Sequence, residues 1–576
     1  MSNATLELPA WDLDPIFPGL ESPQFARAWE AVKVHLGELK AFCSELKSSD
    51  FPELVNKLNS FGEDATPVYA YLYLLTSVNS LDTAAQAKLS EMQIMFLEYQ
   101  KLRPRLNTFF ASLEPGSAGE YRILVEEARV KARHQMSEPE EVLAAELALS
   151  GSTGWVKLHD NLTSQILVTV GGQELPMPAT RNLAADPNEA VRKSAYDAEL
   201  AAWKANQTAI AAALNGYKGS VSTLNRKRGW ADDLEPELLA NRISRATLGA
   251  MQAAMVGSFP HWRRYFGAKA KALGKARLDW WDLFAPLSAP AGHQPMSWDW
   301  ETGRDFIVKH LATFSKDDAE LAERAYAQRW TDAPPRRGKQ GGAYCLGVGR
   351  GLSRILTNYQ PNFDAVTTMA HELGHAYHNH CLRDAPYLLR TEPMTLAETA
   401  SIMNETVVGE AAMEVLPPAD QLVVLEGGLQ NAGQVIVDIH SRFLFESKVF
   451  ARRRERELSP EEFCGLMLDA QQQTYGDGLA SYHPYMWAVK GHYYGSNFYN
   501  FPYAFGLLFG LALFRRYQQE GPDFVARYDQ LLASTGKYSV EELAAQFGFD
   551  LESEDFWQGG IDVLVGRIDQ FERLVG

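Results

Sequence analysis

Apolar residues recur at intervals of three and four along most of the chain, which is the spacing of an amphipathic helix. Residues 25–47, 83–113 and 138–150 all follow this pattern. Residues 189–224 are rich in alanine, which predicts a long helix or a helix hairpin. The pattern therefore predicts a mainly α-helical fold.

Strand-like sequence is confined to two places. Residues 164–176 read SQILVTVGGQELP, in which two glycines at 171 and 172 supply a turn between short strands. Residues 341–348 and 353–360 are two β-rich pieces joined by a short Gly/Arg stretch, which predicts a second hairpin. This hairpin comes directly before the helix that carries most of the candidate chemistry, so we expect a small β-sheet beside that helix.

Charge and composition exclude several classes of partner. A formal net charge of −17 argues against a nucleic-acid partner, because phosphate binding needs a basic surface. The most apolar run, residues 501–514, is too short and too rich in Gly and Pro to span a bilayer. The N-terminus lacks a basic segment followed by an apolar one, so we expect no signal peptide. The four cysteines form no CxxC pair, which favours reduced thiols in a cytoplasmic protein.

Residues 367–380 read TTMAHELGHAYHNH and hold four of the 13 histidines. We expect a helix here, with Asp364 as its N-terminal cap. His371 and His375 are one helical turn apart, about 6 Å along the axis, so both imidazoles can reach one ion. Glu372 flanks this pair, where its carboxylate can take a proton from a metal-activated water. This is the HExxH pattern of zinc hydrolases.

A zinc hydrolase needs a third protein ligand and an open fourth position. The extended pattern HExxHxxGxxH fails, because His378 stands at the Gly position and Cys381 at the last His position. The other known arrangement takes a Glu from a following helix. Residues 394–406 read MTLAETASIMNET and carry Glu398. We therefore expect Glu398 to be the third ligand of one Zn²⁺ ion per chain.

Three further polar residues near the motif have different expected roles. Glu405 follows Glu398 by two helical turns on nearly the same face. It either orients a ligand imidazole or is a solvated helix charge, and both alternatives stay open. His378 lies about 10 Å along the axis from His371, too far to share an ion with it. We expect His378, like His380 near the helix end, to be structural.

The sequence resembles the oligoendopeptidase F family of zinc metallopeptidases, within the thimet oligopeptidase superfamily. The resemblance rests first on AHELGHAYH followed by LAETASIMNE. GAYCLGV and ILTNYQPNFDAVTTMAHELGH upstream, and WAVKGHYYGSNFYNFPYAFG downstream, support it. With 576 residues, the chain is too long for one core. We expect an N-terminal helical region of the oligoendopeptidase F type over residues 1–188 and a catalytic zinc peptidase domain over residues 189–576.

The resemblance implies a two-lobed helical zinc peptidase with a small β-sheet beside the active site and a deep substrate channel. Its substrates would be short unfolded peptides, cleaved at internal bonds in the cytoplasm. His371, His375 and Glu398 would hold the zinc, which polarises the scissile carbonyl. Glu372 would carry the proton from the attacking water to the leaving amine.

The C-terminal stretch HYYGSNFYNFPY offers further donors. In the resembled family, a histidine and tyrosines of this segment face the zinc and bind substrate. His492, Tyr499 and Tyr503 match those positions, and would stabilise the developing oxyanion. Phe501 stands where the family often has Tyr, so one donor is missing there. We expect the tyrosine pair at 493–494 to pack in the core.

The first strand of the second hairpin is the expected substrate clamp. An exposed sheet edge can pair with an extended peptide through main-chain hydrogen bonds. We expect Gly342, Ala343, Tyr344 and Cys345 to bind the substrate there, since glycine allows close backbone approach. Cys345 could instead be a nucleophile, but no histidine or acidic partner can be placed for it from sequence.

Two alternatives remain. A zinc carboxypeptidase with the same ligands would need a cationic subsite, for which Arg350, Arg354 and Lys490 are the candidates. A catalytically inactive peptide-binding homologue is disfavoured, because all four key positions of the zinc motif are intact. The sequence fits a monomer or a homo-oligomer equally well.

Overall fold

The computed structural model of the protein describes residues 8–287 and 296–576. Residues 1–7, part of the segment for which we expect no signal peptide, lie outside the described residues. The chain forms two compact units, each assembled from three separate segments. Unit 1 consists of residues 1–133, 296–415 and 510–550, and unit 2 of residues 134–295, 416–509 and 551–576.

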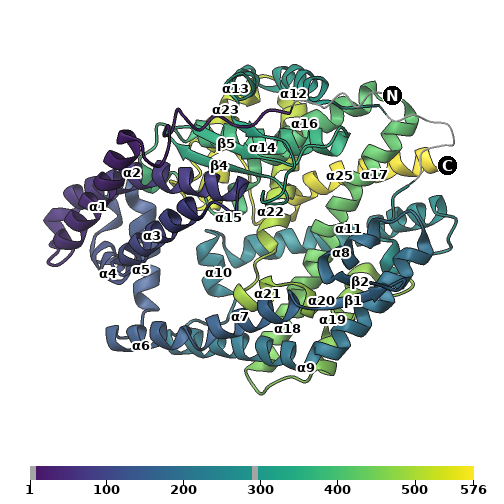
Figure 1. Cartoon of the computed structure of the whole chain (residues 1–576), viewed down its shortest axis with the longest axis horizontal. Coiled ribbons are helices and arrows are strands. Elements are labelled where there is room, and N and C mark those ends of the chain that lie inside the picture. The colour runs from purple at the N-terminus through teal and green to yellow at the C-terminus, as the bar shows by residue number, and fades with distance from the viewer. Residues whose placement is uncertain (1–7, 288–295) are drawn as a thin grey trace. The chain divides into compact units, whose positions relative to one another are not determined.

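Helices make up most of the described chain, as the apolar pattern predicts (Figure 1). Within the described residues, strands form one sheet of two strands and one of three. The mainly α fold with small sheets is therefore confirmed. In the described ranges, no helix has the length and apolar character needed to cross a membrane.

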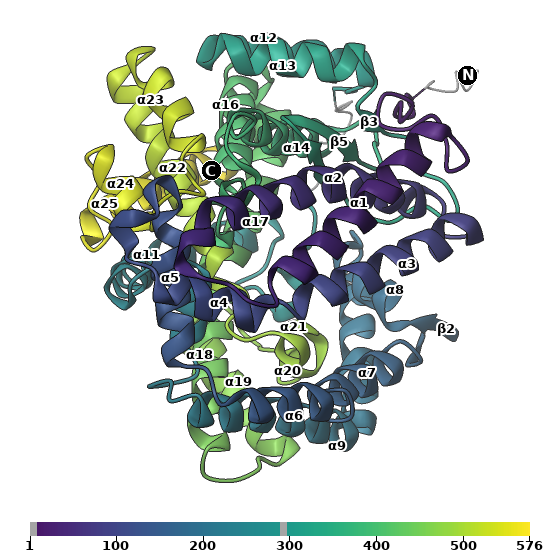
Figure 2. The ribbon, with the colours of Figure 1, turned by 90° about the vertical axis from the view of Figure 1, so that its left-hand side faces the viewer.

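Unit 1 begins with helices that pack on one another and continues with those around the motif (Figure 2). Its helices are α1 Pro23–Phe42, α2 Phe51–Val78, α3 Thr83–Gln100, α4 Arg103–Ser112, α5 Arg122–Arg133, α12 Trp300–Phe314, α13 Lys316–Ala327, α14 Phe363–Cys381, α15 Met394–Ala397, α16 Thr399–Val415, α23 Asp523–Leu532 and α24 Val540–Gln546. Helix α22 Phe501–Glu520 contributes its second half.

The expected helix over residues 83–113 is two helices. Helix α3 ends at Gln100 and α4 begins at Arg103. Pro104 lies in the first turn of α4, where its missing N–H costs nothing.

The three-stranded sheet belongs to unit 1. Its strands are β3 Thr331–Asp332, β4 Tyr344–Gly349 and β5 Leu352–Leu356, in the order β3-β5-β4. Strands β4 and β5 form the expected antiparallel hairpin, and β4 is an edge strand. Helix α2 packs against it, with Ala70 and Leu74 in contact with Val348. Main-chain groups along one side of β4 therefore have no strand partner in the described sheet.

Helices α14 and α16 lie side by side next to this sheet (Figure 1). Gly374 permits the close approach, since a Cβ there would overlap the Ala400 carbonyl oxygen and lie 2.6 Å from Ser401 Cα. Asn362, and not Asp364, caps α14. Its side chain accepts a hydrogen bond from the Ala365 N–H at 2.9 Å. The expectation for Asp364 was wrong because the helix begins two residues earlier than that cap requires.

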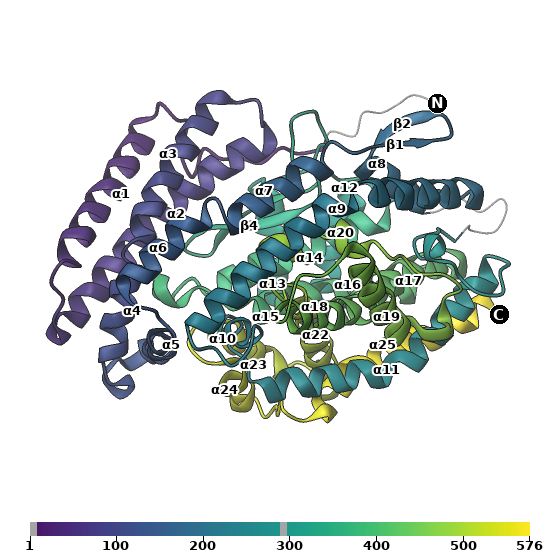
Figure 3. The same ribbon diagram turned by 90° about the horizontal axis from the view of Figure 1, so that it is seen from below.

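Unit 2 is also mostly helical (Figure 3). Its elements are α6 Glu138–Ala148, α7 Ser152–Thr163, β1 Leu167–Val170, β2 Gln173–Pro176, α8 Met177–Asn182, α9 Glu189–Lys227, α10 Glu235–Ala240, α11 Arg245–Ala272, α17 Pro418–Gly433, α18 Ile439–Arg453, α19 Pro460–Tyr475, α20 Met486–Val489, α21 His492–Gly495 and α25 Glu554–Val575, with the first half of α22.

The alanine-rich segment forms one long helix, α9, rather than a helix hairpin. Strands β1 and β2 form the first expected hairpin, and Gly171 and Gly172 take positive φ angles of 59° and 84° at its turn. Asn188 caps α9 at the expected domain boundary. Residues on both sides of that boundary belong to unit 2, so the division into 1–188 and 189–576 stays a prediction.

Candidate active site

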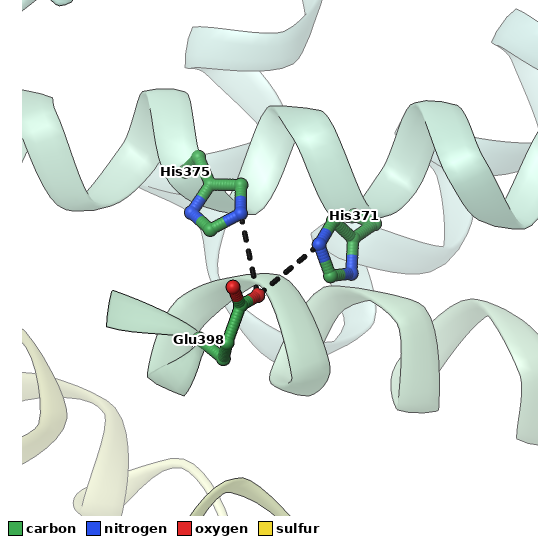
Figure 4. A group of neighbouring side chains, drawn as sticks. All are labelled: His371, His375 and Glu398. Atoms are coloured by element: carbon green, nitrogen blue, oxygen red, sulfur yellow. Dashed lines mark ion pairs between the residues drawn. The ribbon is translucent and has the colours of Figure 1, made fainter. Parts of the chain in front are cut away.

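Helix α14 presents two histidines one turn apart on the side that faces Glu398 (Figure 4). His371 Nε2 lies 3.2 Å from Glu398 Oε2, and His375 Nε2 lies 3.4 Å from the same oxygen. The three ligand atoms are all within 4.8 Å of one another. The residues expected as metal ligands are thus brought together around one point.

Glu398 occupies the break between α15 and α16. It is the residue that ends α15, with φ −87° and ψ 4°, and α16 starts at the next residue. Ser401 Oγ donates a hydrogen bond of 2.9 Å to Glu398 Oε2. The carboxylate is therefore held by a short local contact as well as by the two imidazoles.

The electrostatics of this cluster favour a positive charge. Burial alone would raise the pKa of Glu398, but hydrogen bonds from His371 and His375 hold it below its usual range. Burial alone would lower the pKa of His371, but hydrogen bonds to Glu398 and Glu405 outweigh burial and raise it to about 10. A cation placed between these groups would satisfy the same carboxylates.

The ligand spacing fits a zinc ion. Two ligands about 2.0–2.1 Å from a tetrahedral ion are about 3.3 Å apart, which matches the two histidine–carboxylate separations. His371 Nδ1 lies 3.2 Å from Glu405 Oε2, on the side of the ring away from Glu398. Metal-binding histidines commonly bond a carboxylate through their second ring nitrogen. The donor set is therefore one that could hold a metal ion.

Glu372 follows His371 directly on α14. Its side chain is 6% exposed, and its Oε2 has no hydrogen-bond partner among the described residues. Burial raises its pKa, while His371 and His375 partly offset the rise. A buried carboxylate with a free oxygen is suited to accept a proton from a bound molecule.

A pocket of about 420 Å³ contains these groups. Helix α14 and Glu398 form one wall, and Ala343, Tyr344, Cys345 and Gly347 line another. The edge strand β4 therefore borders the candidate metal ligands. None of the described residues that line the pocket is Lys or Arg.

Two family models match the sequence. Peptidase family M3 matches residues 307–563, which include the HExxH motif, and Oligopeptidase F matches residues 113–166. The chain belongs to peptidase family M3. It is therefore a peptidase.

Two curated relatives align with this M3 peptidase over nearly its full length. Oligopeptidase PepF of Bacillus subtilis is 25% identical, over 98% of this chain and 87% of its own. An oligoendopeptidase F homolog of Lactococcus lactis is 24% identical, over 100% of this chain and 98% of its own. The resemblance to oligoendopeptidase F read from the motifs is thereby confirmed.

Solved structures share the fold of this M3 peptidase. A Chlamydophila abortus crystal structure matches at a TM-score of 0.82 with 20% identity, covering 98% of each chain. Oligoendopeptidase-F from Enterococcus faecium matches at a TM-score of 0.68 with 16% identity, covering 96% of this chain and 97% of that one. At these identities the likeness establishes the helical fold.

Cys345 has the environment of an unreactive thiol in this M3 peptidase. Burial raises its pKa, and the nearby Glu372 carboxylate raises it further. The thiolate needed for nucleophilic attack is therefore disfavoured. Gly342 precedes β4 with φ 79°, and its carbonyl accepts a hydrogen bond from Asn358 at 3.0 Å. Gly342 does not line the pocket, unlike the three residues that follow it.

The C-terminal candidates belong to unit 2, where they form a cluster of their own. The rings of His492 and Tyr499 lie 4.6 Å apart, and the hydroxyls of Tyr499 and Tyr503 are 3.1 Å apart. His492 is exposed. Tyr493 and Tyr494 are buried in the core of unit 2, as expected. The roles of the first three residues toward substrate stay predictions.

Two residues near the ligands were not found from the sequence. Ser401, which bonds Glu398, stands three positions after it, a spacing that could have indicated the contact. Asn379 lines the pocket and donates to Ser353 Oγ at 3.1 Å. Only the packing of α14 against β5 reveals that contact. His378, expected to be structural, is buried and lies 2.9 Å from Thr535 Oγ1.

Proposed function

We propose that this M3 peptidase is a zinc-dependent oligoendopeptidase that hydrolyses internal bonds of short unfolded peptides in the cytoplasm. One observation carries the proposal: His371, His375 and Glu398 converge on one point, beside Glu372, whose free carboxylate oxygen lies in the same pocket. One Zn²⁺ per chain is the cofactor that this donor set favours.

His371, His375 and Glu398 would hold the zinc, and Glu405 would fix the orientation of His371 through its Nδ1. When bound, the zinc polarises the scissile carbonyl and makes water acidic enough to attack it. Glu372 takes the proton of that water and delivers it to the leaving amine. The burial that raises the pKa of Glu372 helps it to hold this proton between the two steps.

Strand β4 would hold the substrate as an added strand. Ala343, Tyr344 and Cys345 line the pocket from the free edge of the sheet. Main-chain pairing reads an extended backbone and not a particular side chain, which suits unfolded peptides of varied sequence. His492, Tyr499 and Tyr503 are the proposed donors to the oxyanion of the tetrahedral intermediate.

Endopeptidase action is favoured over carboxypeptidase action, because a carboxypeptidase needs a cation for the terminal carboxylate. No described residue that lines the pocket supplies one. Arg354, one candidate, is buried and donates to the Asp12 and Ser353 carbonyls. Arg350 is exposed in the β4–β5 turn, 3.7 Å from Glu63. Lys490 is not among the residues that line the pocket.

The proposal is tested with an internally quenched fluorescent peptide of about ten residues whose two termini are blocked. We expect the unmodified protein to cleave it, to lose activity with a chelator, and to regain activity with zinc. Glu372→Gln should bind zinc normally but lower kcat by about 10²–10⁴-fold, the range for loss of a general base.

Each part of the proposal has its own contradicting result. Cleavage of the same peptide only when its C-terminus is free would favour the carboxypeptidase. Full activity in Glu372→Gln would remove the assigned base. Full activity in protein that contains no metal by elemental analysis would reject the zinc mechanism. Zinc binding without cleavage of any peptide would favour an inactive peptide-binding homologue.

A further inference from the structure

A second pocket, of about 360 Å³, lies in unit 2 where helices α9 and α18 end. One face of α9 contributes Gly219, Ser222, Thr223 and Arg226, which follow the i, i+3, i+4, i+7 spacing of a single helix face. Trp230, just after α9, forms another part of the lining and stacks on the His134 ring at 3.6 Å. The pocket has the size of a small-molecule site.

Arg453, the last residue of α18, lies flat against α9 in this pocket. Its Nε donates a hydrogen bond of 3.0 Å to the Asn215 carbonyl. Gly219 makes room for the guanidinium, since a Cβ there would lie 2.8 Å from Arg453 Cζ. Glu457 is 3.7 Å from Arg453 Nη2, but the Glu457 side chain is 75% exposed, so this ion pair is weak. The two Nη groups of Arg453 therefore keep donors for a ligand.

Arg454, the next residue, is held by a buried carboxylate. Its Nε and Nη2 lie 3.0 and 2.9 Å from Asp233 Oδ2. Asp233 also accepts hydrogen bonds from Ser222 and Asn225. This contact fixes the guanidinium plane and leaves the Nη1 amino group unused by Asp233. Arg454 is thus a preorganised donor at the rim of the pocket.

Arg226 is exposed, and its side chain has no hydrogen-bond or ion-pair partner among the described residues. All five of its N–H donors are available. It faces the same pocket as Arg453 and Arg454. The lining contains no carboxylate among the described residues, so three guanidinium groups and two hydroxyls meet around one space.

The charge balance of the pocket is positive. Asp233 offsets one of the three guanidinium charges. The C-terminal ends of α9 and α18 each act as about half a negative charge, which offsets about one more. A positive excess remains in a chain whose formal net charge is −17. The neighbouring arginines 452 and 456 do not add to it, because both lie near Glu462.

We infer that this pocket is an oxyanion site, which binds the phosphate or carboxylate group of a small ligand. Guanidinium groups match the geometry of both oxyanions with paired N–H donors. Thr223 adds a hydroxyl donor beside them, while the hydroxyl of Ser222 donates to Asp233. The site is independent of the proposed peptidase mechanism, and none of its residues belongs to the zinc pocket.

Calorimetric titration of the full-length protein tests this inference, with pyrophosphate as the phosphate probe and succinate as the carboxylate probe at constant ionic strength. We expect one saturable site per chain for at least one of the two. Arg226→Gln should weaken it roughly tenfold or more, through loss of charge-assisted hydrogen bonds. Gly219→Ala should weaken binding similarly, because the added methyl group displaces Arg453. Alanine is a better helix former than glycine, so α9 itself should not be destabilised.

Arg452→Gln is the matched control, because Arg452 precedes Arg453 but lies 3.9 Å from Glu462. It should leave binding unchanged, and a thermal melt of each variant checks that it is folded. Saturation by pyrophosphate alone identifies a phosphate site, and saturation by succinate alone identifies a carboxylate site. Absence of saturable binding by both probes overturns the inference. Equal weakening by Arg226→Gln and Arg452→Gln also overturns it, because that result indicates general charge attraction.

Discussion

At the scale of single residues, His371 is fixed from both sides of its ring. Its Nε2 faces Glu398 and its Nδ1 faces Glu405, each at 3.2 Å. A carboxylate on Nδ1 holds the proton there, so Nε2 keeps its lone pair for a metal. Glu405 is partly exposed, with 42% of its side chain accessible. Its contact with His371 favours the role of orienting that imidazole, which stays a prediction.

We predict that Glu405→Ala weakens zinc binding about 10–100-fold without unfolding the protein, because the ring of His371 loses its orientation. A competition titration against a fluorescent zinc chelator measures the effect. Glu414→Ala is the control, since Glu414 is exposed near the end of the same helix. Equal zinc affinity in the two variants would show that Glu405 is only a surface charge.

Residue spacing predicts contacts within a helix better than contacts between helices. The pairing of His371 with His375 follows from helix geometry alone. The approach of Glu398 to both depends on how α14 packs on α16, which one sequence does not specify. Asn362 and Asp364 show that even a helix start is hard to predict from sequence. Both are good capping residues, and only the backbone conformation decides which one caps α14.

At the scale of elements, the α14–α16 contact determines whether the ligands can meet. Gly374 lies between the two histidines, at the point where α14 touches the backbone of Ala400 and Ser401. Glu398 and Glu405 are positioned by α16 and the break before it. The distance between these helices therefore sets the distance between the histidines and the carboxylates.

We predict that Gly374→Ala lowers thermal stability by about 1–3 kcal/mol and weakens zinc binding, because the added methyl group forces the helices apart. Alanine is a better helix former than glycine by about 1 kcal/mol. Helix propensity alone would therefore make the variant more stable, which is the opposite of the predicted effect. Gly409→Ala in α16 is the matched control, since a Cβ there meets nothing within 4 Å. A thermal melt with and without zinc measures both effects. A Gly374→Ala variant as stable as Gly409→Ala would contradict this account.

A buried acid between α13 and α16 gives a second prediction. Asp318 is fully buried, and its Oδ2 has no hydrogen-bond partner among the described residues. Its Oδ1 accepts a long hydrogen bond from Asn404 Nδ2, at 3.4 Å. Burial raises the pKa of Asp318 to about 8. The folded protein therefore keeps this proton over a pH range in which the unfolded chain has lost it.

We predict that stability falls as pH rises from about 4 to about 8, because the unfolded state binds fewer protons there. Asp318→Asn removes this titration. The free energy of unfolding of the variant, relative to that of the unmodified protein, should therefore rise by up to a few kcal/mol as the pH approaches 8. Denaturant unfolding at several pH values measures the difference. Asp317 is an exposed neighbour in the same turn. Asp317→Asn should leave the slope of unfolding free energy against pH unchanged. Parallel pH curves for the unmodified protein and Asp318→Asn would refute the assignment.

At the scale of the whole molecule, the chain order does not follow the two compact units. Each unit combines three segments, and unit 1 joins α1–α5 to elements more than 160 residues further along the chain. Local apolar patterns predicted the helices and both hairpins, because those contacts are close in sequence. They could not predict which distant segments share a core, because an apolar helix face does not specify which other helix it packs against. The structure shows which segments share each unit.

The interleaved units make a prediction about cutting the chain between residues 188 and 189. We expect the 189–576 fragment alone to aggregate and to bind little zinc. Without α2, the apolar face of β4 at Val348 loses its cover from Ala70 and Leu74, and an exposed apolar face associates with other chains.

Within unit 2, α9 would likewise lose Trp155, which packs against Gly216. Co-expression with the 1–188 fragment should restore a soluble complex with about one zinc per complex, measured by size-exclusion chromatography and elemental analysis. A 189–576 fragment that melts cooperatively and holds one zinc by itself would instead establish the boundary at 188 as a true domain boundary, because a domain folds on the contacts within its own segment.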